Sequence, residues 1–226
     1  MGKVIMSGIV PQLILPVTSI VLSTIAEGSV VKINEAGDPV EFYVAKHDYE
    51  PTLNGYGRTL LVRKDCCNKR QWHTSDKNVY SSCALDTWFN GKYKSFLDEE
   101  VQSAIATTEF YCAKGSGSTT LTTLSRAIFA LSSNEVGADS NATTEEGSEL
   151  PTAELLNIAY LNGSTVDQWL RSVSIYNSKQ ACYVNDDDGK AYQTECTDSN
   201  RAPRPCFTLP SDALFDNKTL EFKGVS

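Results

Sequence analysis

Positive charge is scarce in this sequence. Its 20 lysines and arginines stand against 28 aspartates and glutamates, which gives a formal net charge of −8, and no run of basic residues interrupts the acidity. Such a chain would repel a phosphate backbone, so nucleic acid is not an expected partner. The acidic residues gather at 135–149 and at 186–188, and both stretches have the composition of solvated loops.

Histidine is scarcer still, because the chain has only His47 and His73. With so few histidines, no Ser–His–Asp order can be argued. The sequence also has no glycine-rich phosphate loop. The carboxylate pairs at 99–100 and 145–146 are typical of the solvated residues of a helix and a loop. Adjacent cysteines at 66 and 67 lie near His73 in the sequence. Nothing supplies the orienting third group that a nucleophile and its base need. We therefore expect that the protein is not an enzyme.

The spacing of a metal site is also absent. The seven cysteines contain no C-x-x-C pair, and the triplet at 186–188 lacks the twelve-residue calcium-loop pattern with its terminal glutamate. We expect no metal and no cofactor. Cys83 and Cys112 are most simply interpreted as buried thiols. On a particle outside the cell, some of the seven cysteines could oxidise.

Charged residues are missing from residues 4–26, VIMSGIVPQLILPVTSIVLSTIA. As a signal peptide this stretch has a weak charged region and no small-x-small cleavage site, and as a membrane span it is interrupted by two prolines and a glycine. Its β-branched residues and spaced prolines favour an extended arm, residues 1–27, that docks on another subunit or protein without membrane insertion. The apolar residues of this docking arm are Val10, Leu13, Leu15, Val17, Ile20 and Val21.

From residue 28 to residue 226 we expect one α+β domain. Residues 30–49 contain two β-rich runs around 35–39, and the alternation of Val40, Phe42 and Val44 predicts a β-hairpin. A strand is expected at 59–63 and another at 127–131, with a loop from there to residue 148 and a short helix at 152–163. Asp86 and Asp98 are the expected N-caps of two further short helices.

A series of motifs in the last third, QWLRS (168–172), ACYV (181–184) and RPCFTLP (204–210), resembles the C-terminal half of C-type-lectin-like domains in phage and prophage proteins. Residues 30–65, 85–105 and 124–137 look like the uncharacterised phage-associated domain of prophages in gut Firmicutes. The resemblance implies a C-type-lectin-like fold with short helices and a twisted antiparallel sheet, related to the formylglycine-generating enzyme. Its fold-core motif corresponds to Trp169, Arg171, Ser172, Arg204 and Pro205.

This chain departs from the family pattern at two places. Ala202-Pro203 stands where a glycine usually precedes Arg-Pro, and Cys182, Cys196 and Cys206 occupy strand positions that need not hold cysteine. The calcium-site triplets of sugar-binding C-type lectins are also missing. From the residues themselves, Trp169 and Arg171 are expected to anchor the core, with the guanidinium satisfied by backbone carbonyls or by an acidic side chain.

The segment YNSKQACYVNDDDGKAYQ (176–193) is rich in the residues that contact surfaces use, and in the family such a hairpin is exposed. We expect its loops and outward faces to bind a ligand, although Asn, Asp, Ser and Gly are also what any turn needs. The candidate ligand-binding residues are Tyr176, Asn177, Ser178, Asn185, Asp187, Tyr192, Thr194, Asp198 and Asn200.

The resemblance and the arm together predict a phage virion surface protein made in the bacterial host cytoplasm. The arm would dock on capsid or tail proteins, and the hairpin would bind a host-surface glycan or protein, so the expected role is adhesion. A homo-oligomer is expected, with a trimer favoured, because virions repeat their attachment points. Two alternatives are a purely structural decoration protein of capsid or tail, and a secreted or anchored bacterial binding protein.

Overall fold

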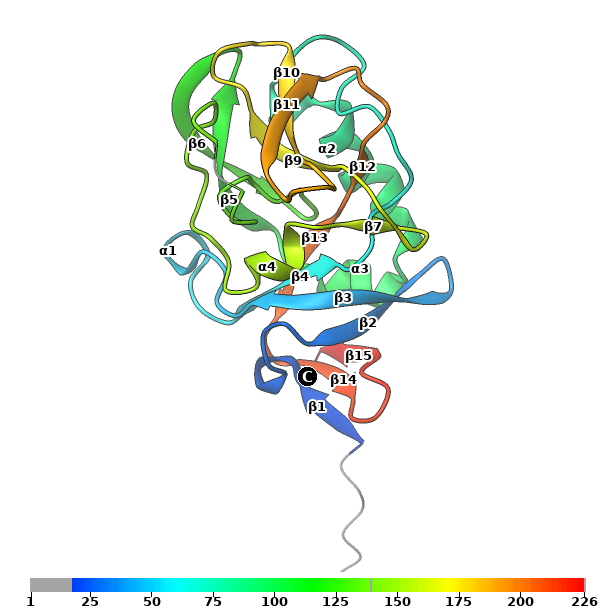
Figure 1. Cartoon of the computed structure of the whole chain (residues 1–226). Coiled ribbons are helices and arrows are strands. Elements are labelled where there is room, and N and C mark those ends of the chain that lie inside the picture. Colours follow the sequence, from blue (N-terminus) through cyan, green and yellow to red (C-terminus); the bar gives the residue numbers. More distant parts are fainter. Residues whose placement is uncertain (1–17, 139, 226) are drawn as a thin grey trace, which may run out of the picture.

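The computed structural model describes residues 18–138 and 140–225. Short antiparallel sheets make up most of the fold, and short helices pack between and beside them, so the domain is α+β (Figure 1). The β10–β11 hairpin lies at one end of the molecule, and β1, β14 and β15 lie at the other (Figure 1).

The central sheet has four antiparallel strands in the order β13-β4-β3-β2. Hydrophobic side chains alternate along β2 and β3, and Val31, Phe42 and Val44 are fully buried on one face, so the predicted hairpin is confirmed. The predicted strand at 59–63 is confirmed as β4. The four strands are β2 (Val30–Glu35), β3 (Asp38–Lys46), β4 (Arg58–Arg63) and β13 (Cys206–Pro210).

A second four-stranded sheet has the order β11-β10-β9-β12. Every residue of β9 is buried, whereas β11 lies at the edge and is half-exposed. The short strand that contains Pro203 runs parallel to β9. The strands are β9 (Gln168–Val173), β10 (Gln180–Val184), β11 (Ala191–Glu195) and β12 (Ala202–Pro203).

The third sheet joins the two ends of the described chain. Its order is β1-β14-β15, formed by β1 (Ser19–Val21), β14 (Ala213–Asp216) and β15 (Phe222–Val225). Ile20 and Val21, which the sequence assigns to the docking arm, therefore pair with β14 of the same chain, and Leu22 behind them is fully buried. The intramolecular contacts thus begin inside the range 1–27. Val10, Leu13, Leu15 and Val17 lie outside the described residues.

Two small ribbons complete the strands. They are β5 (Thr108–Gly115) with β6 (Ser118–Arg126), and β7 (Tyr160–Leu161) with β8 (Ser164–Thr165). The strand predicted at 127–131 is wrong, because β6 ends at Arg126 and the next residues are a buried connection with one bridge, Phe129 to Cys206. These residues are apolar because the connection is buried in the core, and apart from this bridge they form no strand pairing in the described part of the chain.

The helices are all short. They are η1 (Leu22–Thr24), α1 (Pro51–Asn54), η2 (Tyr80–Ser82), α2 (Ala84–Trp88), η3 (Phe89–Tyr93), η4 (Lys94–Phe96), α3 (Glu99–Ala104) and α4 (Ala153–Leu156). Asp98 is the N-cap residue of α3, but Asp86 is not an N-cap. Cys83 caps α2, and Asp86 lies inside the helix, where it pairs with Arg126 at 2.8 Å. None of the helices in the described part of the chain is long and apolar enough to cross a membrane.

Aromatic rings join the sheets into one core. Phe42 of β3 contacts Phe207 of β13 with ring centroids 5.3 Å apart, and Phe110 of β5 stacks on Phe129 at 4.4 Å. Tyr49 continues this stack, 5.8 Å from Phe129. Such buried rings dominate core energetics, and they bring β5, β9 and the segment around residue 130 against the central sheet, beneath the β10–β11 hairpin.

Candidate functional site

One exposed aromatic side chain of the predicted binding region, Tyr192, lies on β11 and is 44% exposed. In the antiparallel register Tyr183 faces Tyr192 and Ala181 faces Thr194, so Tyr183, Tyr192 and Thr194 share one side of the hairpin. Asp198 joins them, because its Oδ2 accepts from the Thr194 hydroxyl at 3.3 Å. We call Tyr183, Tyr192, Thr194, Asp198 and Arg201 the hairpin face.

A row of rings runs from the core to solvent across the hairpin face. The buried Trp169 ring meets Tyr183 edge-on at 6.4 Å, and Tyr183 lies 6.1 Å from Tyr192. The Arg201 guanidinium sits 4.0 Å above the Tyr183 ring and ion-pairs with Asp198. Each ring is held by its neighbour, so the exposed Tyr192 offers contact area that is already ordered.

Hydrogen bonds fix the outermost ring. The Tyr192 hydroxyl donates to Asp188 Oδ2 at 3.0 Å, and this bond raises the pKa of the phenol. The pKa of Asp188 is lowered, first by the Lys190 backbone N–H and also by the Tyr192 hydroxyl. At neutral pH the edge of β11 therefore presents a neutral phenol beside an ionised carboxylate.

The turn residues mainly hold the turn. Asn185 Nδ2 donates to Asp167 Oδ1 at 3.3 Å, and Asn185 Oδ1 accepts from the Asp187 backbone N–H at 3.1 Å. Asp198 Oδ1 accepts from the Asn200 N–H at 2.8 Å. These are the side-chain to backbone bonds that stabilise turns, whereas the side chains of Asp187 and Asn200 point to solvent as exposed residues.

Tyr176, Asn177 and Ser178 occupy a different place. The Tyr176 side chain is 78% exposed and its hydroxyl donates to the Asn141 carbonyl at 3.3 Å. That loop contacts the other side of β11, where Gln193 Nε2 donates to Ser140 Oγ at 3.1 Å. Successive strand residues point to opposite sides, so Gln193 and the 140–141 loop that it contacts lie on the side of the hairpin opposite to Tyr192 and Thr194. Tyr192, Thr194 and Asp198 come together, and Tyr176 does not join them.

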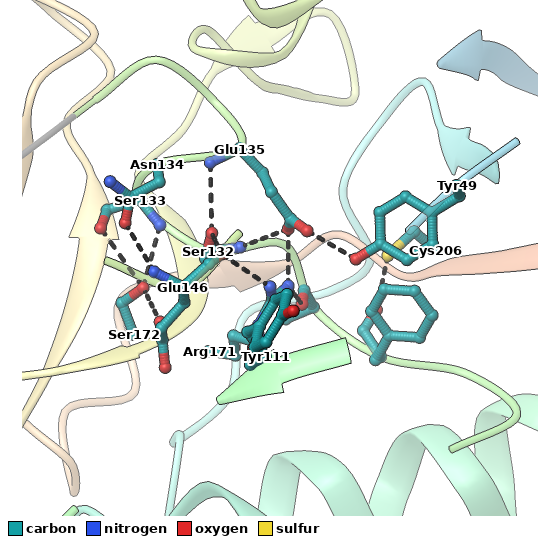
Figure 2. A network of polar contacts seen from close by, with 12 residues as sticks. Tyr49, Tyr111, Ser132, Ser133, Asn134, Glu135, Glu146, Arg171, Ser172 and Cys206 are labelled. Carbon is teal, nitrogen blue, oxygen red and sulfur yellow. Dashed lines mark hydrogen bonds and ion pairs between the residues drawn. The ribbon is translucent and has the colours of Figure 1, made fainter. Parts of the chain in front are cut away.

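A buried ion pair is formed by Arg171 of β9, the strand that pairs with β10 of the hairpin (Figure 2). Arg171 Nη1 contacts Glu135 Oε2 at 2.6 Å, and both side chains are fully buried. The Tyr49 hydroxyl donates to the other oxygen of Glu135 at 2.5 Å. The remaining guanidinium donors reach the carbonyls of Tyr111, Ala130 and Glu146 at 3.0 to 3.1 Å. One side chain of β9 thus joins β5, the connection after β6 and the loop before α4.

Glu146 extends this network to the far side of β9 (Figure 2). Its carboxylate accepts from the Ala113 backbone N–H and from the Ser172 hydroxyl, and Ser172 in turn accepts from the Ser133 N–H at 2.9 Å. Burial raises the pKa of Glu146 above its ordinary value, and the nearby Arg171 guanidinium offsets only part of this rise. The interpretation of residues 135–149 and of the pair 145–146 as solvated is therefore wrong for Glu135 and Glu146, because both carboxylates face buried donors instead of water.

Trp169 and Arg204 hold the other half of the motif in place. Trp169 Nε1 donates to the Arg70 carbonyl at 2.8 Å. Arg204, 1% exposed, donates to the carbonyls of Arg63 and Lys64 at 2.7 Å each. Pro205 follows in a buried stretch that leads into β13. The remaining Arg204 donors reach the Leu156 carbonyl, Gln168 Oε1 and the Leu155 carbonyl at 3.1, 3.3 and 3.5 Å, so the guanidinium has no donor left to offer a ligand.

The cysteines lack the environment of nucleophiles. All seven are free thiols, six of them are buried, and Cys67 is half-buried. Burial raises the pKa of Cys66, Cys67, Cys112 and Cys196 to about 12. A reactive cysteine needs a lowered pKa, so these thiols serve as core residues.

Both histidines are engaged locally. His47 lies between the Thr59 hydroxyl and the Ile25 carbonyl, each at 2.9 Å, and His73 Nδ1 accepts from the Thr74 N–H at 2.8 Å. Within residues 18–138 and 140–225, no group of three or more His, Cys, Asp or Glu side chains is arranged to hold a metal ion.

Comparison with known proteins gives one result. No curated protein and no solved structure matches the chain. A family model does match, over residues 56–211, a span that runs from just before β4 through β13. It includes the hairpin face and, apart from Tyr49, the buried residues around Arg171. More than half of the chain lies in this match, so the protein belongs to the family described as domain of unknown function (DUF6273).

Proposed function

We propose that this domain is a non-catalytic binding module and that the hairpin face is its contact surface. The observation that carries the proposal is the row of rings from Trp169 through Tyr183 to Tyr192, which ends in a tyrosine that is 44% exposed on an edge strand. Rigid tyrosines beside adaptable polar groups are typical of recognition surfaces. Buried thiols of raised pKa and locally bonded histidines give no support to a catalytic alternative.

We propose further that the fold is C-type-lectin-like and that the module belongs to a phage virion. This rests on the resemblance of QWLRS, the hairpin and RPCFTLP to the phage domains. The arrangement supports it, because β9 is fully buried, β10–β11 projects outward, and Arg204-Pro205 leads into β13. An experimental structure that showed a different strand order around β9 would refute the assignment of the fold.

In this proposal the arm docks the module on capsid or tail proteins and the hairpin face adheres to a host-surface glycan or protein. Figure 1 supports this assignment of roles, since β1 lies at the end of the molecule opposite to β10–β11. A homo-oligomer, with a trimer favoured, would multiply weak contacts by avidity.

The location is tested by mass spectrometry of purified phage particles, cleared lysate and host membranes. Many copies per particle, with the N-terminal peptide intact, are expected. A deletion of residues 1–17 should abolish incorporation while the domain still folds, because β1 and Leu22 are retained. A processed chain found only in the host envelope would instead indicate a secreted or anchored bacterial binding protein.

The contact surface is tested by replacing Tyr192 and Thr194 together with alanine. Loss of an ordered aromatic anchor should weaken attachment to host cells by about tenfold or more. Tyr176→Ala is the matched control, since it removes an exposed tyrosine from the other side of the hairpin. Unchanged attachment in the double variant, together with reduced particle stability, would contradict adhesion and favour a structural decoration protein.

A further inference from the structure

A cavity of about 470 Å³ opens on a part of the domain that the proposed function does not use. It lies between the segment after β4 and the run of helices from α2 to η4, with β7 at its rim. We call it the Arg70 pocket. The residues that matter for its chemistry are Arg63, Arg70, Trp88, Lys92, Phe96 and Asn162.

Arg70 stands apart from the other arginines of the chain. Its guanidinium carbon lies 3.4 Å from the centre of the Trp88 ring, so the planar group is stacked on the indole. Its Nε is buried without an acceptor. All seven arginines lie in the described part of the chain, and the six others each donate a side-chain hydrogen bond to a carbonyl or a carboxylate, whereas Arg70 has no such bond there. A stacked guanidinium keeps its in-plane donors free for a planar anion.

The charges of the pocket leave positive charge unbalanced. Glu35 is the one carboxylate among its lining residues, and it is already engaged by Arg63 Nε at 3.0 and 3.2 Å and by the Tyr93 hydroxyl. Lys92 Nζ lies 4.9 Å from the Phe96 ring and has no ion pair among the described residues. In a chain of net charge −8, two cations without counterions in one concave site favour an anionic ligand.

The size and the walls of the pocket narrow the choice of anion. About 470 Å³ is within the range of small-molecule sites, about 300–1,000 Å³, and exceeds what a bare carboxylate or phosphate fills. The walls combine apolar surface from Phe96 and Leu161 with the amides of Asn68 and Asn162. Apolar faces beside amide groups match a ring that carries both C–H faces and hydroxyls. The guanidinium fork fits a carboxylate with two parallel bonds.

We propose that the Arg70 pocket binds an acidic sugar, with its carboxylate held by Arg70 and Lys92 and its ring against Phe96 and the two asparagine amides. The lining of the pocket shares no residue with the hairpin face, although the Arg70 backbone N–H donates to the Arg201 carbonyl at 3.0 Å, and the proposed sugar binding does not rest on the proposed adhesion. Cys67 at the wall takes no part in a reaction there, because burial raises the pKa of its thiol to about 12.

The test is a calorimetric titration of the full chain with D-glucuronate, with D-glucose, acetate and inorganic phosphate at equal ionic strength as comparison probes. We expect saturable binding of glucuronate alone, accompanied by a change in tryptophan fluorescence. Trp88 is the half-buried tryptophan at the pocket, while Trp72 and Trp169 are fully buried. No saturation by glucuronate would overturn the proposal, and so would equal binding of acetate or phosphate, since that describes a general anion patch.

Variants locate the binding. Arg70→Ala should weaken glucuronate binding by about tenfold or more, and Arg70→Lys, which keeps the charge and loses the fork, should fall between it and the original chain. Lys69→Ala is the matched control, because it removes one positive charge from the adjacent exposed residue outside the pocket lining. Unchanged affinity in Arg70→Ala, or an equal loss in Lys69→Ala, would refute the site. If Arg70→Ala fails to fold, Arg70→Lys and Lys92→Ala carry the same comparison.

Discussion

The buried pair of Arg171 and Glu135 allows a sharp test of what holds the hairpin in place. We predict that Arg171→Met lowers the free energy of unfolding by about 3–5 kcal/mol, the usual cost of removing one partner of a buried ion pair. The reason is that Glu135 stays fully buried and keeps only Tyr49 and the Ser132 N–H as donors, at 2.5 and 2.9 Å. Three backbone carbonyls also lose the guanidinium as a donor, although that of Glu146 keeps the Ser132 hydroxyl at 2.7 Å.

A matched control exists on the surface. Lys64 and Glu41 form an ion pair with the same N–O distance, 2.6 Å, but their side chains are 39% and 46% exposed. Lys64→Met should cost about 0–1 kcal/mol, because solvent already screens this pair. Tyr49→Phe gives an intermediate case, since it removes one hydrogen bond to Glu135 and leaves the ring stacked on Phe129.

Urea denaturation at neutral pH, followed by circular dichroism, measures all three changes. The slope with denaturant should stay constant, so that the shift in midpoint reports stability alone. A typical domain has only about 5–15 kcal/mol of stability in total, so Arg171→Met should unfold at far lower urea. Equal losses in Arg171→Met and Lys64→Met would refute the reasoning that burial, and not distance, sets the cost.

Three further predictions concern a turn, a carboxylate and the thiols. Gly115→Ala should lower the free energy of unfolding by about 3 kcal/mol or more, because φ is +77° and a Cβ would lie 2.2 Å from the Asn78 carbonyl oxygen. Gly37→Ala, where φ is +89° and the space is open, should cost about 1 kcal/mol. Chemical denaturation that ranked the two variants equally would contradict this. Burial raises the pKa of Glu146 above its ordinary 4.5. The protonated side chain therefore gives its full contribution to stability below pH 4.5, and this contribution is lost as the pH rises through the raised pKa of the folded protein. Glu146→Gln should therefore gain stability relative to the original chain as pH is raised. A difference in the free energy of unfolding that stayed constant between pH 5 and pH 8 would contradict this prediction. With pKa values near 12, about one thiol in ten thousand of Cys66 or Cys112 is ionised at pH 8, so a thiol reagent should label these cysteines at once in urea and barely in the folded protein.

The sequence predicted those elements whose apolar residues alternate on one face. The hairpin of β2 and β3 is such a case, with Val40, Phe42 and Val44 in step. The ribbon of β5 and β6 was missed, because β6 is exposed along most of its length and its threonines show no hydrophobic period. The tight turn between these strands uses two glycines of positive φ, which local composition alone did not distinguish from a loop.

The buried carboxylates could not be predicted from their own segment. Glu135 and Glu146 lie in a polar, acidic stretch, and only the approach of Arg171, 36 and 25 residues further along, turns them into interior residues. The same holds for Arg70 and Trp88, which lie 18 positions apart along a stretch that is irregular up to η2 and α2. For the hairpin, composition made Tyr192 and Thr194 candidates, but the side of the strand on which each side chain lies needed the register.

The pairing of β1 with β14 bears on how the domain would withstand a pulling force. A force applied at residue 18 draws β1 along its own axis, while the rest of the domain holds β14 through β13 at the opposite end of the strand. The pairs Ser19–Asp216, Ile20–Phe215 and Val21–Leu214 then resist together in shear, instead of opening one after another as in a peeled ribbon. The next residue, Leu22, is fully buried, so withdrawal of β1 would also require its side chain to leave the core. Tension between residue 18 and the hairpin at the far end is thus borne by the sheet before it reaches the core.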